Sequence, residues 1–208
     1  SIHGARTGDA AGVPIHVADV NGDGFGDVVF GGAESAGPDG QRVGCGSVWI
    51  VFGSDAWPVE TDLATLPLGV TVIHGAREND HLGHIGSIKS GDLDGDGTAD
   101  LILGAMDADG PAGDREGGGE VDVIWGRREF SSSIDLALVT AGVTRLFGEF
   151  SFDLLGGRGF FTAGDLNGDG KEDLIVRTNH WHTPGDEREA ADDYHVFFGG
   201  VRFPAVMD

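Results

Sequence analysis

The sequence predicts an all-β protein that is built from three copies of one four-stranded unit. Three clusters of acidic residues share one pattern, and their first aspartates, Asp19, Asp92 and Asp165, are each 73 residues apart. The last aspartates of the clusters keep this spacing, and so do the glycines that end a later apolar run: Asp27, Asp100 and Asp173, and Gly53, Gly126 and Gly199. A constant period of this kind is the signature of a repeat architecture.

The middle copy shows the elements of one repeat most clearly. Four short runs rich in β-branched and aromatic residues are expected to be strands, over 84–91, 100–106, 119–126 and 143–148. Clusters of Gly, Asp and Ser separate these runs. The segment 134–142 could instead form a short turn of helix. Several four-stranded repeats in one chain predict small sheets arranged radially, which is a β-propeller.

We expect residues 1–208 to form a single β-propeller domain, with repeats over approximately 5–75, 76–148 and 149–208. The sequence begins with "SIHG", which matches "VIHG" at 72–75, so residues 1–4 are expected to be an outer closing strand. Propellers typically have about four to eight blades, and three are too few to close a ring. Two possibilities stay open, namely half of a six-bladed ring made by two chains, and one part of a larger propeller.

Each acidic cluster predicts a metal-binding loop. Oxygen-bearing side chains occupy positions 1, 3, 5 and 9, and position 6 is always Gly, which suits a sharp turn with positive φ. Position 7 has no common side chain, as expected if its backbone carbonyl is the ligand. The expected ligands are Asp19, Asn21, Asp23, Phe25 and Asp27 in the first loop, Asp92, Asp94, Asp96, Thr98 and Asp100 in the second, and Asp165, Asn167, Asp169, Lys171 and Asp173 in the third.

The chemistry of these ligands indicates Ca²⁺. Alternating carboxylates around a tight turn provide about six hard oxygen donors, which Ca²⁺ prefers, whereas Mg²⁺ demands stricter octahedral geometry. An EF-hand requires an acid at position 12 and flanking helices, but position 12 is Phe30, Leu103 or Val176. The alternative is a metal-free Asx-turn hairpin. Because three such loops would each crowd like charges unless a cation offset them, we expect three structural calcium sites.

The loops and their context resemble the FG-GAP repeats of integrin α-subunit propellers and their bacterial relatives. The matching segments are "HLGHIGSIKSGDLDGDGTADLILGA" and "GGGEVDVIWG" in the middle copy and "LLGGRGFFTAGDLNGDGKEDLIV" in the third. The resemblance covers essentially the whole chain. It implies a β-propeller with Ca²⁺ bound between strands 1 and 2 of each blade, used outside the cell for adhesion or assembly. Two departures are a segment two residues shorter before the first loop, and Arg177 and Thr178 in place of a Gly–small pair in the third copy.

Composition limits the classes of partner that the chain is expected to bind. The net charge of −22 repels nucleic acid and anionic membrane surfaces, so neither is expected as a partner. No apolar run is long enough for a membrane span, and no secretory h-region is present. The single cysteine, Cys45, allows no intramolecular disulfide and is expected to be a small core residue. The resemblance favours an extracellular, cell-surface or periplasmic location.

No catalytic site is predicted. The sequence shows no hydrolytic nucleophile with its base, no phosphate-binding loop and no zinc signature. The pairs His81/His84 and His180/His182 are more typical of exposed loop histidines than of ligands to zinc or haem iron. The long polar segment 179–193 is the best candidate for contact with a partner.

The sequence therefore predicts a non-enzymatic, calcium-stabilised module for protein–protein interaction, adhesion or assembly. Its expected partner is another protein or a second copy of itself. Two alternatives remain open. The first is a lectin, in which Trp57 or Trp181 would stack on a glycan. The second is a non-catalytic accessory subunit of a secreted or periplasmic enzyme complex.

Overall fold

The structure is a computed structural model that describes residues 1–57, 59–138, 141–179 and 192–207. It confirms the expected all-β class. Within these residues the chain forms fifteen strands and one short 3₁₀ turn, η1 (Leu63–Thr65). The strands make two five-stranded sheets, one three-stranded sheet and one two-stranded pair.

The two larger sheets have the same topology. Four strands of the first sheet pair antiparallel, namely β2 (Ile15–Ala18), β3 (Asp27–Gly32), β4 (Ser47–Val51) and β6 (Val70–His74), and β10 (Ser133–Asp135) pairs parallel to β6. The second sheet repeats this with β7 (Ile88–Gly91), β8 (Asp100–Ala105), β9 (Glu120–Ile124), β11 (Val143–Phe147) and β15 (Val206–Met207). The third sheet contains β12 (Phe161–Gly164), β13 (Asp173–Asn179) and β14 (Asp192–Phe197).

The four strands expected in the middle copy are all present. Their ends differ from the expected ones by at most two residues, except at the start of the first strand, which was wrong. The strand expected over 84–91 begins only at Ile88. Residues 84–87 form a turn instead, in which the Ser87 N–H donates to the His84 carbonyl at 3.0 Å. The described part of 134–142 holds the end of β10 and turns rather than helix, whereas the corresponding place in the first repeat holds η1.

Each five-stranded sheet has a short outer strand that was not predicted. β10 belongs to the second repeat but pairs with β6 of the first, with Ile134 opposite Ile73. β15 pairs with β11 in the same way, with Met207 opposite Leu146. These strands have only two or three residues and pair across repeats, so the local hydrophobic pattern gives little sign of them. Each of them ties one repeat to the sheet before it.

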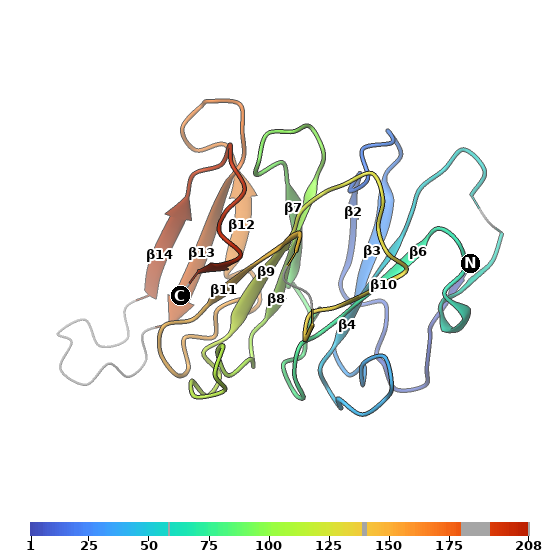
Figure 1. The fold of residues 1–208 in the computed structure, drawn as a ribbon, viewed down its shortest axis with the longest axis horizontal. Coiled ribbons are helices and arrows are strands. Elements are labelled where there is room, and N and C mark those ends of the chain that lie inside the picture. Colours follow the sequence, from blue (N-terminus) through green and yellow to red (C-terminus); the bar gives the residue numbers. More distant parts are fainter. Residues whose placement is uncertain (58, 139–140, 180–191, 208) are drawn as a thin grey trace.

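The two-stranded pair is the same kind of parallel pairing between successive repeats. β1 (Ile2–His3) lies parallel to β5 (Thr61–Asp62), with Ile2 opposite Thr61. Thr61 lies 73 residues before Ile134, so it occupies the same position one repeat earlier. The pairing of β1 with β5 therefore corresponds to the pairing of β6 with β10. This register agrees with the expected match between residues 1–4 and 72–75. β1 does not complete the third sheet of its own chain, because the N-terminus and β14 lie at opposite ends of the molecule (Figure 1).

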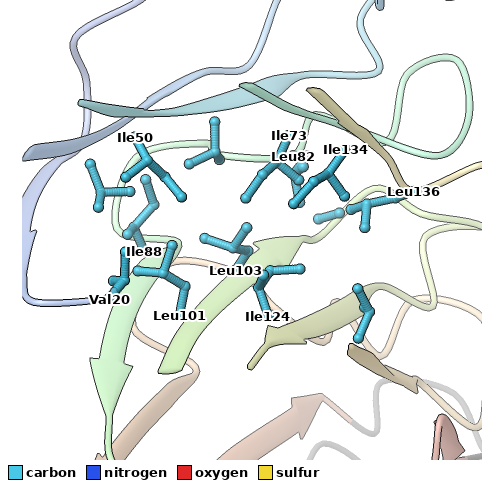
Figure 2. Close-up of a cluster of buried hydrophobic side chains, with 14 of the residues drawn as sticks. Val20, Ile50, Ile73, Leu82, Ile88, Leu101, Leu103, Ile124, Ile134 and Leu136 are labelled. Atoms are coloured by element: carbon cyan, nitrogen blue, oxygen red, sulfur yellow. The ribbon is translucent and has the colours of Figure 1, made fainter. Parts of the chain in front are cut away.

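The three sheets stand side by side (Figure 1), and clusters of buried apolar side chains pack between successive sheets. Because side chains alternate along a strand, the middle sheet supplies an apolar face to each neighbour. Figure 2 shows the cluster between the first two sheets, which includes Ile50, Ile73, Leu101, Leu103 and Ile124. A second cluster joins the second sheet to the third through residues that include Ile102, Val123, Leu174 and Val176.

Candidate metal centre

The three acidic loops lie side by side at one end of the sheets. They connect β2 to β3, β7 to β8 and β12 to β13, along the upper edge in Figure 1. The Ala99 N–H in the second loop donates to the Asp19 carbonyl in the first at 3.1 Å. The Glu172 N–H in the third loop donates to the Asp92 carbonyl in the second at 3.2 Å. The repeat period therefore corresponds to a direct contact between successive loops.

In each loop the carboxylate at position 1 organises the turn. Its Oδ2 accepts the N–H of the position-6 glycine, at 2.9 Å from Gly24, 3.0 Å from Gly97 and 2.9 Å from Gly170. These glycines have φ values of +91°, +88° and +85°, which residues with a Cβ adopt only with strain. The backbone thus explains why position 6 is always Gly.

The side chains at positions 3 and 5 turn inward in all three loops. The position-5 N–H donates to Oδ1 of position 3, and the position-7 N–H donates to Oδ1 of position 5, over 2.8–3.1 Å. The donors are Asp23 and Phe25, Asp96 and Thr98, and Asp169 and Lys171. Positions 3 and 5 thus turn inward in all three loops, and position 7 is held through its backbone. Among the described residues, only the second loop gathers three carboxylates, those of Asp92, Asp94 and Asp100, and this group does not include Asp96.

The second loop has the geometry that most favours a cation. Asp92, Asp94 and Asp100 each place one carboxylate oxygen within 4.8 Å of the others. Oδ1 of Asp92 is buried and has no hydrogen-bond partner, which is costly unless a positive charge satisfies it. In the first and third loops, Asn21 and Asn167 donate from Nδ2 to the position-5 aspartate at 2.9 and 3.0 Å. The all-oxygen donor set of the second loop fits Ca²⁺.

The position-9 aspartates have a further role that we did not predict. For Asp27, Oδ2 accepts the Val20 N–H at 2.9 Å and Oδ1 accepts the Gly53 N–H at 2.8 Å. Asp100 and Asp173 make the same two bonds with the equivalent donors, at 2.7–2.9 Å. Each of these carboxylates therefore pins its loop to the end of the third strand of its sheet. The constant spacing of 26 residues between aspartate and glycine was the available signal.

Burial makes the charge of Asp27 and Asp100 costly. Burial raises the pKa of Asp27, and the N–H groups of Gly53 and Val20 oppose that rise. Burial, reinforced by the charges of Asp94 and Asp96, raises the pKa of Asp100 to about 7. A divalent cation in the second loop would offset this penalty, because an opposite charge favours the ionised carboxylate.

Two basic side chains from the third repeat lie against the second loop. Nε of Arg202 donates to Oδ2 of Asp94 at 2.7 Å, and Nη2 of Arg202 is 3.5 Å from Oδ2 of Asp96. The side-chain carbons of Lys171 lie 3.2 Å from the place that a Cβ on Gly95 would occupy. Arg202 is 108 residues from Asp94, so no local pattern indicates the contact. Its guanidinium partly neutralises the loop and would compete with a cation for Asp94.

Replacing Arg202 with Ala is expected to tighten calcium binding to the second loop by up to about fivefold. The guanidinium has to leave Asp94 before that carboxylate can turn toward a metal. The Arg202 side chain is half-exposed and the Asp94 side chain is nearly buried, and we take the upper part of the range of about 0.2–1 kcal/mol for a surface ion pair. Isothermal titration calorimetry measures the change. Arg158→Ala, an exposed position before β12 at the other end of the sheets, is the control for net charge. Unchanged or weaker binding in Arg202→Ala would contradict the competition.

The other side chains that the sequence singled out lie outside the loops. Nδ1 of His81 is 2.9 Å from Oδ2 of Asp107, and Nδ1 of His84 is buried without a hydrogen-bond partner. Trp57 is 41% exposed. Cys45 is buried, which raises the pKa of its thiol to about 11, as expected of a small core residue. His180, Trp181, His182 and most of the segment 179–193 lie outside the described residues.

Comparison with known proteins adds no assignment: no family model matches the chain, and no curated protein matches it. In the part of the chain that the structure describes, no helix has the length and apolar character needed to cross a membrane.

Proposed function

We propose that the chain is a calcium-stabilised β-propeller module that works outside the cytoplasm in protein–protein interaction, adhesion or assembly. The arrangement of the sheets supports the propeller. Two sheets have the same strand order, and each sheet meets the next through a buried apolar cluster. Antiparallel sheets that recur at a fixed sequence period and pack face to face are what the blades of a propeller require. In this proposal each sheet is one blade.

The second loop is the observation that carries the calcium assignment. It combines three carboxylates with oxygens within 4.8 Å of one another and a buried oxygen of Asp92 that has no partner. The same turn in the first and third loops supports two further sites. Each ion would tie together the first two strands of its blade. Calcium sites of extracellular modules typically have Kd values of about 10⁻⁴–10⁻³ M, and we expect affinities in this range.

Calorimetric titration of the full chain with CaCl₂ tests the assignment. We expect three ions per chain, and we expect MgCl₂ to bind more weakly because Mg²⁺ needs a stricter octahedron. Heats that do not exceed those of dilution would contradict the proposal. Preference for Mg²⁺ would contradict the choice of metal.

Asp96→Ala is expected to lower the Tm by about 3–6 °C in calcium buffer and to change it little in chelator. One ion at ten times its Kd contributes about 1.4 kcal/mol, and about 1 kcal/mol shifts the Tm of a domain of this size by about 2–4 °C. Differential scanning calorimetry in the two buffers gives the comparison. Asp55→Ala, an exposed acid outside the loops, is the control. Equal losses in both buffers would refute the metal role of Asp96.

A further inference from the structure

The outer face of the third sheet exposes positions that are buried in the other two repeats. We define this face by Leu166, Tyr194 and Val196, which are 59%, 67% and 41% exposed. Their counterparts in the second repeat (Leu93, Val121 and Val123) and in the first (Val20, Val48 and Ile50) are all 0% exposed. In those two repeats the following sheet covers these positions. The outer face of the third sheet is therefore one half of an interface that the chain already forms twice.

The opposite end of the molecule exposes the other half of this interface. Ile15 in β2 is 67% exposed, whereas its counterparts Ile88 and Phe161 are 4% and 2% exposed. Ile88 and Phe161 each belong to a cluster that packs on the preceding sheet. The two ends of the molecule (Figure 1) are thus complementary in the way that successive sheets within the chain are complementary.

A cavity of about 340 Å³ lies between the second and third sheets, next to β14. Its walls include Leu146 and Phe147 of β11 and Val176, His195 and Phe197 of the third sheet. The equivalent space between the first two sheets is filled by Val143 and Arg145 of β11. Val143 belongs to the buried cluster there, and Nε of Arg145 donates at 3.1 Å to Asp122, the counterpart of His195. The cavity therefore lies beside the position that a fourth strand of the third sheet would occupy.

We propose that these surfaces receive a second copy of this chain, head to tail, and that β1 of the second copy joins β14 as the fourth strand. The inference rests on the proposed propeller and names its partner. β1 already lies on β5 as β6 lies on β10, and β6 pairs with β4 with Ile73 opposite Val48 and His74 opposite Ser47. Ile2 and His3 of β1 match Ile73 and His74 of β6, and Tyr194 and Asp193 of β14 match Val48 and Ser47 of β4. The same register therefore places Ile2 opposite Tyr194 and His3 opposite Asp193.

The side chains at this register are complementary. In the first sheet, Oγ of Ser47 lies 2.9 Å from Nδ1 of His74. The corresponding pair at the junction is Asp193 and His3, a carboxylate that accepts hydrogen bonds and an imidazole that can donate one. Ile2, now 36% exposed, takes the place of Ile73, which is fully buried. The exposed Ile2 and Tyr194 would cover each other.

The position where the third repeat breaks the pattern also fits this junction. A Cβ on Gly31 or Gly104 would lie 2.0 or 2.1 Å from a carbonyl oxygen of the following repeat, so only Gly fits there. The third repeat has Arg177 at this position. The segment of the second copy that would face Arg177, between Gly4 and Asp19, is two residues shorter than its counterparts. The shorter segment leaves room for the larger side chain.

Two copies related in this way form two identical junctions, and the assembly closes as a ring of six sheets. Sedimentation velocity of the full chain in calcium buffer is expected to give twice the chain mass of 21.6 kDa. Val196→Asp places a charge on an exposed site of the outer face and is expected to give the monomer mass. Leu138→Asp, at an 80% exposed site in the middle repeat, is the matched control and is expected to remain a dimer. A wild-type monomer at every loading concentration, or an open polymer, overturns the proposal.

A disulfide trap tests the register. Ile2→Cys combined with Tyr194→Cys is expected to give a covalent dimer on a non-reducing gel, because residues opposite each other on antiparallel strands lie within disulfide reach. Ile2→Cys with Val196→Cys is two residues out of register and serves as the control. Cys45 is buried and does not compete. No crosslink, or equal crosslinks in both pairs, overturns the register.

Calcium titration of the same samples separates this inference from the proposed function. A monomer that binds three calcium ions overturns the docking and leaves the calcium-stabilised module intact. A dimer that binds no calcium supports the docking and contradicts the calcium assignment.

Discussion

Chelation of calcium is expected to lower the Tm of the full chain by about 8–16 °C. Each ion at ten times its Kd adds about 1.4 kcal/mol to the free energy of unfolding, so three ions add about 4 kcal/mol. About 1 kcal/mol shifts the Tm by about 2–4 °C in a domain of this size. Most of the effect comes from repulsion between carboxylates, which is no longer offset once the ion is removed. The folded loop holds Asp92, Asp94 and Asp100 within a few ångströms of one another. Scanning calorimetry in calcium and in chelator measures it.

Two controls make this result specific. Magnesium at the same concentration is expected to restore only part of the lost stability. A triple variant, Asp23→Ala, Asp96→Ala and Asp169→Ala, removes the position-5 carboxylate from all three loops. In calcium buffer it is expected to unfold near the Tm of the wild type in chelator. A wild-type Tm that is the same in both buffers would contradict a structural role for calcium.

The repeat period predicted the all-β class and most of the strands, because the same weak local pattern recurs in three copies. One run such as 143–148 is an ambiguous strand, but the same run in register with two others is not. The missed elements, β10 and β15, are two or three residues long and pair with a different repeat. Their stability comes from the edge of a neighbouring sheet, and residues close in sequence carry no trace of that edge.

The candidate site shows the same division. The residue types in the second loop predicted the turn that gathers Asp92, Asp94 and Asp100, because a tight turn brings alternating side chains together within one loop. The contact between Arg202 and Asp94 depends on how the third repeat packs against the second, so local spacing does not reveal it. The double role of Asp27 was hidden for another reason: a carboxylate that accepts two backbone N–H groups and one that binds a metal have the same letter in the sequence.

Asp27→Ala is expected to lower the Tm by about 4–8 °C in chelator, where no metal contributes. The substitution leaves the N–H groups of Val20 and Gly53 without their acceptor, and Val20 is fully buried. An unsatisfied buried N–H costs about 1–3 kcal/mol. Removal of the buried charge returns part of this, because burial raises the pKa of Asp27 and so marks its ionised form as destabilised. We therefore expect a net loss of about 2 kcal/mol, which corresponds to that shift in Tm.

The comparison with Asp96→Ala separates the two roles of the acidic residues. Asp96 is exposed, and its effect is expected only when calcium is present, whereas the effect of Asp27→Ala is expected in both buffers and is larger in calcium. Asp27→Asn keeps one acceptor oxygen and is expected to lose about half as much as Asp27→Ala in chelator. If Asp27→Ala and the wild type had the same Tm in chelator, the two hydrogen bonds to Val20 and Gly53 would not hold the loop to β4. The invariance of position 9 would then have to come from the metal alone.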